Sequence, residues 1–295
     1  MKKIICFVFI ITCFMSGVNA LAQATLFEFP IAPDTCSSIE SRCNYSVQHF
    51  WDKCELTKPF DAKNDSLLMD AMLTYFDIMR AGANVNVSLA SVRNLMFKAQ
   101  ANHDNFLRLA SVAEYLLYYH DFEFIDDLYI AFAQSVADAN WAKKEVRNHY
   151  SDQVKRLSTT KLGQPMPDFE YTSITGVRKH LFDNKIGSKV YVLLFTDAES
   201  SSSIERMRLS TDVAISQLVE SDHLEIINIL ITDAPKKWDA DSQSYADTWV
   251  IGATKDVLNK IDLRIMPCVY LLDENFNIVA KNKTVDFVKN LVRGR

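Results

Sequence analysis

The densest cluster of potentially reactive side chains is a run of four serines, Ser200–Ser203, which follows the acidic residues Asp197 and Glu199. A serine acts as a nucleophile only when a base removes its proton and donors stabilise the oxyanion that forms. The only bases in this segment are the two carboxylates, and no histidine lies in it. The pattern Ser202-x-x-Glu205 matches a capping box instead. The sequence therefore predicts that these serines begin a helix, and acyl transfer is disfavoured.

Cys268 is the second residue type with potential chemistry, and it is the only cysteine after Cys54. It follows Pro267 in an otherwise apolar segment. The favoured interpretation is a small residue packed into a buried strand, because buried free cysteines are usually inert. The alternative is a single-thiol redox site, which could form a mixed disulfide but could not resolve it internally.

The N-terminus has the pattern of a targeting segment. Two lysines precede a short apolar stretch from Ile4 to Met15, and A-x-A cleavage signals end at Ala22 and Ala24. The apolar stretch is too short to span a bilayer permanently. We therefore predict a signal peptide over residues 1–22, cleaved near Ala22 or Ala24. The mature protein is expected to be periplasmic or otherwise exported, with no transmembrane segment.

In an oxidising compartment, Cys36, Cys43 and Cys54 could form disulfides. Cys36 and Cys43 are close in sequence, at the start of an expected helix, and a disulfide between them is predicted. A Cys43–Cys54 bridge and three free thiols are the competing states. The cysteine spacing is not that of zinc ligands, and the six histidines form no metal-binding pattern. No metal or other cofactor is therefore predicted.

The N-terminal half has helical periodicity throughout. Apolar side chains recur at steps of three and four residues, without strand alternation and with few glycines. Helices are expected over residues 38–53, 67–82, 88–99, 106–117, 125–136 and 142–157. Ser38 or Ser37 is expected to cap the first of these helices, and Ser88 the third. We therefore predict an all-α domain over residues 36–158, followed by a short polar linker.

After Gly163 the pattern changes to strands that alternate with helices, which is typical of an α/β sheet. The nearly continuous apolar run Val190–Phe195 is typical of a central strand buried on both faces. The other expected elements are a hairpin across 171–179, a helix over 202–220, a strand over 224–231, strands at 269–272 and 278–281, and a helix over 286–293. The fold class predicted is α+β with two domains, the second being an α/β domain over residues 163–295.

Four segments, in this order, make residues 163–295 resemble the thioredoxin-like domain of secreted bacterial thiol-disulfide proteins. They are the opening segment 162–169 with its Pro-Asp-Phe sequence, the strand at 189–197, the strand at 224–231, and the segment 264–273. In the N-terminal half, the segment 42–52 resembles a domain of unknown function that precedes thioredoxin-like domains in some secreted Gram-negative proteins.

The resemblance assigns roles to particular residues. Where the family carries Cys-x-x-Cys, this chain has Ser200 and Ser203, which cannot form a disulfide. The resemblance also implies that the Met266–Pro267 bond is cis and that Met266, Pro267 and Cys268 border a groove for extended peptides. Trp238 and Trp249 either lie near this groove or serve as core or surface packing.

Charge narrows the range of partners. The formal net charge is −5 and no long basic run occurs, so neither nucleic acid nor an anionic membrane surface is an expected partner. Together these features predict a redox-inactive, exported thioredoxin-like protein. Its expected role is to bind or scaffold envelope proteins or extended peptides. The alternative is a weak thiol-disulfide oxidoreductase or thiol sensor that uses Cys268.

Overall fold

The computed structural model describes residues 25–61, 65–120, 126–185, 187, 189–232 and 246–294, so the predicted signal peptide lies outside the described residues. The chain divides into two compact units. The first runs to Ser91 and adds residues 98–105, and the second comprises residues 92–97 and 106 to the C-terminus. Within the described ranges, no helix is both long and apolar enough to cross a membrane.

The first unit is helical. It contains α2 (Ile39–His49), α3 (Asp65–Gly82) and the first part of α4 (Val85–Ala99). The predicted cap at Ser38 is confirmed, because its hydroxyl accepts a hydrogen bond from the Ser41 backbone N–H at 3.0 Å. The predicted cap at Ser88 is wrong. Asn84 accepts the backbone N–H of Asn86 at 2.9 Å, so α4 begins about one turn earlier.

Aromatic rings form much of the core of this first unit. Phe50 stacks on Phe29 with ring centroids 4.8 Å apart, and it contacts Tyr75 at 5.0 Å. The Tyr75 hydroxyl donates to Ser91 Oγ at 2.6 Å, and Ser91 donates to the Val47 carbonyl at 2.7 Å. The buried phenol is thus satisfied by a chain of hydrogen bonds that joins three helices.

The second unit begins with more helix and ends with a sheet. Its helical part holds most of α5 (His103–Ala113), the π-helical turn η2 (Glu114–His120), α6 (Asp126–Ala137) and α7 (Lys144–Thr159). Gln153 of α7 donates to Glu114 at 2.7 Å and accepts a hydrogen bond from the Tyr129 hydroxyl of α6. The predicted sequence of a helical region followed by an α/β region is confirmed.

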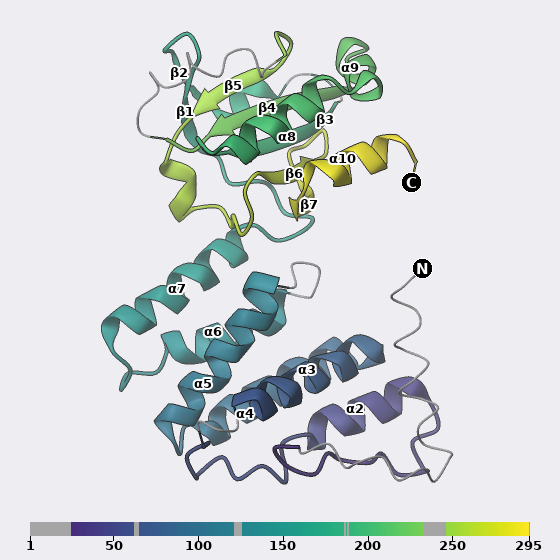
Figure 1. The fold of residues 1–295 in the computed structure, drawn as a ribbon, viewed down its shortest axis with the longest axis vertical. Helices are drawn as coiled ribbons and strands as arrows, with labels where there is room; N and C mark the ends of the chain where they lie inside the picture. Colours follow the sequence, from purple (N-terminus) through teal and green to yellow (C-terminus); the bar gives the residue numbers. More distant parts are fainter. Residues whose placement is uncertain are drawn as a thin grey trace. The chain divides into compact units, whose positions relative to one another are not determined.

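Within the residues that the structure describes, the sheet has seven strands in the order β2-β1-β5-β4-β3-β6-β7 (Figure 1). Their bounds are β1 (Glu170–Ser173), β2 (Arg178–His180), β3 (Val190–Thr196), β4 (Leu224–Leu230), β5 (Val250–Ala253), β6 (Cys268–Leu272) and β7 (Ile278–Lys283). β3 runs parallel to β4 and antiparallel to β6. The predicted central strand is therefore confirmed as β3.

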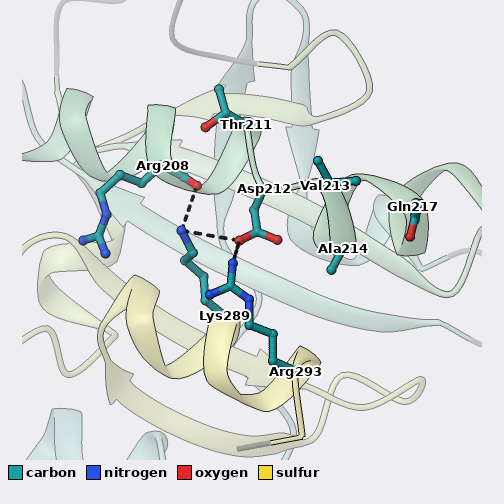
Figure 2. Close-up of a pocket in the computed structure, with 8 residues that line it drawn as sticks. All are labelled: Arg208, Thr211, Asp212, Val213, Ala214, Gln217, Lys289 and Arg293. Atoms are coloured by element: carbon teal, nitrogen blue, oxygen red, sulfur yellow. Dashed lines mark hydrogen bonds and ion pairs between the residues drawn. The ribbon is translucent and has the colours of Figure 1, made fainter.

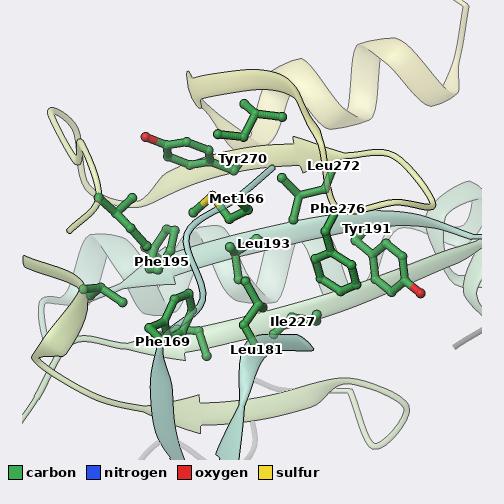
Figure 3. Packing of buried hydrophobic residues seen from close by; sticks show 14 of the residues in the cluster. Met166, Phe169, Leu181, Tyr191, Leu193, Phe195, Ile227, Tyr270, Leu272 and Phe276 are labelled. Carbon is green, nitrogen blue, oxygen red and sulfur yellow. The ribbon is translucent and has the colours of Figure 1, made fainter. Parts of the chain in front are cut away.

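Side chains of β3 alternate between two apolar layers, as the period of a strand requires. Tyr191, Leu193 and Phe195 enter one layer, which Figure 3 shows together with Phe169 and Phe276. Val192 and Leu194 enter the other layer. That second layer packs against α8 (Ser200–Ser210), α9 (Val213–Glu220) and α10 (Val285–Val292).

Two expectations for the sheet region need correction. The single helix expected over 202–220 is two helices, because Asp212 caps α9 by accepting the Ile215 backbone N–H at 3.4 Å. β5 is not predicted by the sequence pattern, since it has only four residues and includes Gly252. The division into domains at residues 158–163 stays a prediction, because the second compact unit includes residues on both sides of it.

Candidate functional site

The serine run lies at the start of α8, where β3 delivers the chain. β3 ends at Thr196, and α8 begins at Ser200 with Glu199 as its N-cap. Ser200 and Ser203 are therefore the first and fourth residues of the helix. The first backbone N–H groups of a helix lack partners within the helix, and its dipole favours negative charge there. In a working redox site this environment would stabilise a thiolate.

Ser202 does not cap the helix, so the predicted capping box with Glu205 is wrong. Glu199 makes no side-chain capping hydrogen bond. The fully buried Ser202 hydroxyl donates to Asp197 Oδ1 at 2.6 Å, and Glu205 pairs with Arg208 at 2.6 Å. The sequence pattern could not show this, because Asp197 lies before the helix and offers a nearby acceptor for the serine.

Ser203 contacts a buried cation. Its hydroxyl accepts a hydrogen bond from Arg206 Nη2 at 2.8 Å, and the Arg206 side chain is fully buried. An arginine stays protonated and cannot act as the base that a serine nucleophile needs. The arrangement instead places a positive charge beside Ser203, the residue that the resemblance assigns to the second cysteine position. The sequence pattern does not single out Arg206, since an arginine at that spacing usually lies on a solvated helix face.

The strand register brings the predicted groove residues to the same end of the sheet as the serine run. Phe195 pairs with Cys268 in antiparallel register, so Pro267, the residue before Cys268, lies at the level of Thr196. Thr196 is four residues before Ser200. The Met266–Pro267 bond is cis, as the resemblance implies. Met266 is half-buried against the apolar layer of Figure 3.

The backbone ahead of β6 is open. Among the residues that the structure describes, no hydrogen bond uses the N–H or C=O groups of Ile265 or Met266. On either side the chain is fixed, because the Arg264 N–H donates to Asn282 Oδ1 at 3.1 Å and Cys268 enters β6. Unpaired backbone groups beside a sheet are a template for pairing with another extended segment.

Cys268 is fully buried and its Sγ donates to Asn282 Oδ1 at 3.4 Å. Burial raises the pKa of the Cys268 thiol well above its ordinary range, and the nearby Asp262 carboxylate raises it further. A thiol that is protonated and inaccessible is a poor nucleophile. This geometry favours the packing interpretation over the redox interpretation.

The other predicted site residues are spread over the chain. Trp249 is only 8% exposed and packs in the layer against α8–α10, whereas Met266 packs against the other layer, and Trp238 lies outside the described residues. Cys36, Cys43 and Cys54 are half-buried free thiols, so the bridge predicted between Cys36 and Cys43 is not formed in this structure. The described ranges contain no group of side chains that could hold a metal ion.

A separate open pocket of about 500 Å³ lies at the C-terminal end of α8 (Figure 2). At its centre Asp212 accepts from Arg293 at 2.6 Å and pairs with Lys289 at 3.4 Å. Because α8 is 11 residues long, this end is about 15 Å from Ser200. The pocket is therefore not part of the serine site, and its charges join α10 to the start of α9.

Comparisons with known proteins agree with this architecture. Residues 15–159 match the model of a family described as Domain of unknown function (DUF5106). No curated protein matches the chain. A crystal structure of a thioredoxin-like protein from Bacteroides caccae matches with a TM-score of 0.77 at 17% identity, covering 92% of this chain and all of that one. At that identity the likeness shows the fold alone, which is thioredoxin-like.

Two shorter structures also match, each over less than half of this chain. The thioredoxin domain of a thiol-disulfide oxidoreductase from Bacteroides vulgatus has 19% identity and a TM-score of 0.39, covering 45% of this chain and 96% of that one. A thiol:disulfide interchange protein from a Bacteroides species has 20% identity and a TM-score of 0.38, covering 46% and 90%.

Proposed function

We propose that this chain, which joins a DUF5106 domain to a thioredoxin-like fold, binds extended peptide segments of envelope proteins without thiol-disulfide chemistry. The observation that carries the proposal is that two features occur together at one end of the sheet. Serines stand at the start of α8, and unpaired backbone groups of Ile265 and Met266 lie ahead of β6. In this proposal, the serines cannot carry out thiol-disulfide exchange, whereas the unpaired backbone groups can still pair with a peptide.

The redox half of the proposal follows from the chemistry of the side chains. Thiol-disulfide exchange needs a thiolate to attack and a second thiol to resolve the mixed disulfide. Ser200 and Ser203 supply neither function. Cys268 is fully buried with a raised pKa, so no observation favours it as a substitute nucleophile.

The binding half follows from the open backbone. An extended peptide that pairs with Ile265 and Met266 would satisfy their backbone groups, and its alternate side chains would contact apolar surface. Ile265 and Met266 pack partly against the apolar layer and stay partly accessible. Export to the envelope is supported by the lysine-led apolar leader with its A-x-A signals.

The binding test uses an unfolded probe and a matched pair of variants. Binding of fluorescein-labelled, carboxymethylated α-lactalbumin is followed by anisotropy, and a Kd on the order of 1–100 µM is expected for a short backbone-paired segment. Met266→Glu should weaken binding by about tenfold or more, because a charge would be buried against the bound peptide. Leu291→Glu also replaces an apolar side chain with glutamate, at a 51% exposed position of α10, and should leave binding unchanged.

Failure to bind the probe, or equal loss in both variants, would overturn the peptide-binding half. The redox half is tested separately by insulin reduction with dithiothreitol. No rate above that of dithiothreitol alone is expected, and turnover like that of an ordinary thioredoxin would contradict the proposal.

A further inference from the structure

Four charged side chains are buried together beside the segment that leads to Pro267. They are Asp126, Asp262, Arg264 and Lys281, whose side chains are 17%, 0%, 1% and 6% exposed. Two positive and two negative charges balance. Buried charges are costly unless each is paired and hydrogen-bonded, so removing one partner leaves an uncompensated charge.

Arg264 is the centre of this buried group. Its Nε donates to Asp262 Oδ2 at 2.8 Å and its Nη2 donates to Asp126 Oδ1 at 2.5 Å. The guanidinium carbon lies 4.9 Å from the centroid of the Tyr118 ring. The planar guanidinium is thus held by two carboxylates and one ring face, which fixes its orientation.

Asp126 differs from the other three members in its place in the chain. It is the first residue of α6, whereas the other three lie between β5 and the end of β7. Its second oxygen pairs with Lys281 Nζ at 2.6 Å. Asp126 therefore bridges both cations, and without it the buried group would carry a net positive charge.

The buried group is tied directly to the open segment. The Arg264 N–H donates to Asn282 Oδ1, and the same oxygen accepts from Cys268 Sγ. Asn282 Nδ2 donates to Asp262 Oδ2 at 2.9 Å. Residues on both sides of Ile265–Pro267 are therefore held by one asparagine, whose partner Asp262 is held by Arg264.

We propose that Asp126 is a positioning residue for the Ile265–Pro267 segment, acting through Arg264. A residue of the helical region thereby sets the conformation of the edge at which peptides pair. The peptide-affinity consequence rests on the proposed function, whereas the conformational consequence does not.

The test compares neighbouring aspartates in the full chain. Asp126→Asn removes the bridging charge, whereas Asp127→Asn makes the same change beside it and removes only the half-exposed pair with Lys161. By NMR, exchange of the Arg264 amide should be at least about tenfold faster in Asp126→Asn and unchanged in Asp127→Asn. Affinity for carboxymethylated α-lactalbumin should fall by a similar factor in the first variant only.

A second variant separates positioning from mere stability. Asp126→Asn with Lys281→Met restores the balance of buried charge and should recover most of the lost Tm, while Arg264 stays without its α6 carboxylate. We expect the faster Arg264 amide exchange and the weaker binding to persist in this double variant. It also carries the test if Asp126→Asn alone does not fold.

Unchanged Arg264 amide exchange in a folded Asp126→Asn protein, or full recovery in the double variant, would overturn the inference. If the wild-type chain binds no probe, the proposed function fails, and the Arg264 amide still decides whether Asp126 positions the segment.

Discussion

At the scale of single residues, the hydrogen bond between Ser203 and Arg206 determines what a Cys-x-x-Cys pair introduced at Ser200 and Ser203 would do. The two positions at the start of α8 are three residues apart on a helix, which is close enough for a disulfide between cysteines. Arg206 Nη2 lies 2.8 Å from Ser203 Oγ and the arginine is fully buried. A thiolate at position 203 would therefore have a permanent cation as a neighbour.

We expect the double substitution Ser200→Cys with Ser203→Cys to gain thiol-disulfide exchange. The helix dipole and Arg206 should both favour a thiolate, and the pair can resolve a mixed disulfide. Insulin reduction measures the gain. Each single substitution is the matched control, since one thiol cannot resolve the intermediate internally. If the double variant forms no disulfide, the assignment of these two serines to the cysteine positions is wrong.

At the scale of elements, Asp212 holds α10 against the α8–α9 junction (Figure 2). Burial alone would raise the pKa of the Asp212 carboxyl. The Ile215 backbone N–H, Lys289 and Arg293 outweigh this and lower it. A depressed pKa in the folded state means that the carboxylate contributes stability above its unfolded pKa of about 3.9, and that this contribution is lost as the pH falls through the folded pKa.

Asp212→Asn should therefore destabilise the protein in a pH-dependent manner. Asparagine is as good an N-cap as aspartate, so the substitution removes the charge and keeps the cap. We expect a loss of about 1–2 kcal/mol in the free energy of unfolding at pH 7. This loss should shrink as the pH falls below the unfolded pKa of about 3.9 and through the lower folded pKa. Urea denaturation at pH 7 and at a pH below the folded pKa measures it. Asp286→Asn, which loses an exposed pair with Arg208, should cost much less than Asp212→Asn. An equal cost for Asp212→Asn at both pH values would contradict the ion-pair explanation.

β5 depends on close approach to β1. Gly252 pairs with Ser173 of β1, and a Cβ at Gly252 would lie 2.2 Å from Tyr171 Cδ2. Tyr171 is itself buried and its hydroxyl bonds to Asn184 at 3.1 Å, so the ring cannot move aside freely. The glycine is required here by the ring that packs over it.

Gly252→Ala should destabilise the second unit by about 1–3 kcal/mol, because it overpacks the interface between β1 and β5. The measurement is a double-mutant cycle with Tyr171→Ala. Once the ring is removed, adding the methyl group should be nearly neutral, since alanine suits a strand better than glycine does. Additive costs in the cycle would mean that the ring is not the obstacle.

These elements show which parts of the fold could be predicted from the sequence. β3 was predicted because its continuous apolar run reflects burial on both faces, which is a property of the strand itself. β5 and the break between α8 and α9 were not, because each depends on a partner distant in sequence or on one capping aspartate. The same reason explains the wrong capping assignment of Ser202, whose acceptor Asp197 lies outside the helix. Arg264 and Asp126 could not be paired from the sequence, because 138 residues separate them.

At the scale of the whole molecule, the change from helices to strands and the boundary between the two compact units fall at different places in the chain. The pattern changes from helix to strand near residues 158–163, yet the second compact unit includes α6, α7 and the sheet together. Contacts cross the predicted boundary. Thr159 Oγ1 donates to the Lys260 carbonyl at 2.8 Å, and Arg264 reaches Asp126.

We therefore expect α7 and β3 to open in a single cooperative step. Separating the sheet region from α6 would remove the Asp126 carboxylate from Arg264 and Lys281. Partial opening between α6 and the sheet should therefore be unfavourable. In native-state hydrogen exchange at increasing denaturant, slowly exchanging amides of α7 and β3 should converge on free energies within about 1 kcal/mol of each other. Amides of α3, in the first unit, are the internal comparison, because they belong to a separate compact unit. If α7 lost protection at a denaturant concentration that left β3 protected, the boundary at residues 158–163 would be the one that governs folding, and the buried ion group would be a local contact without cooperative consequence.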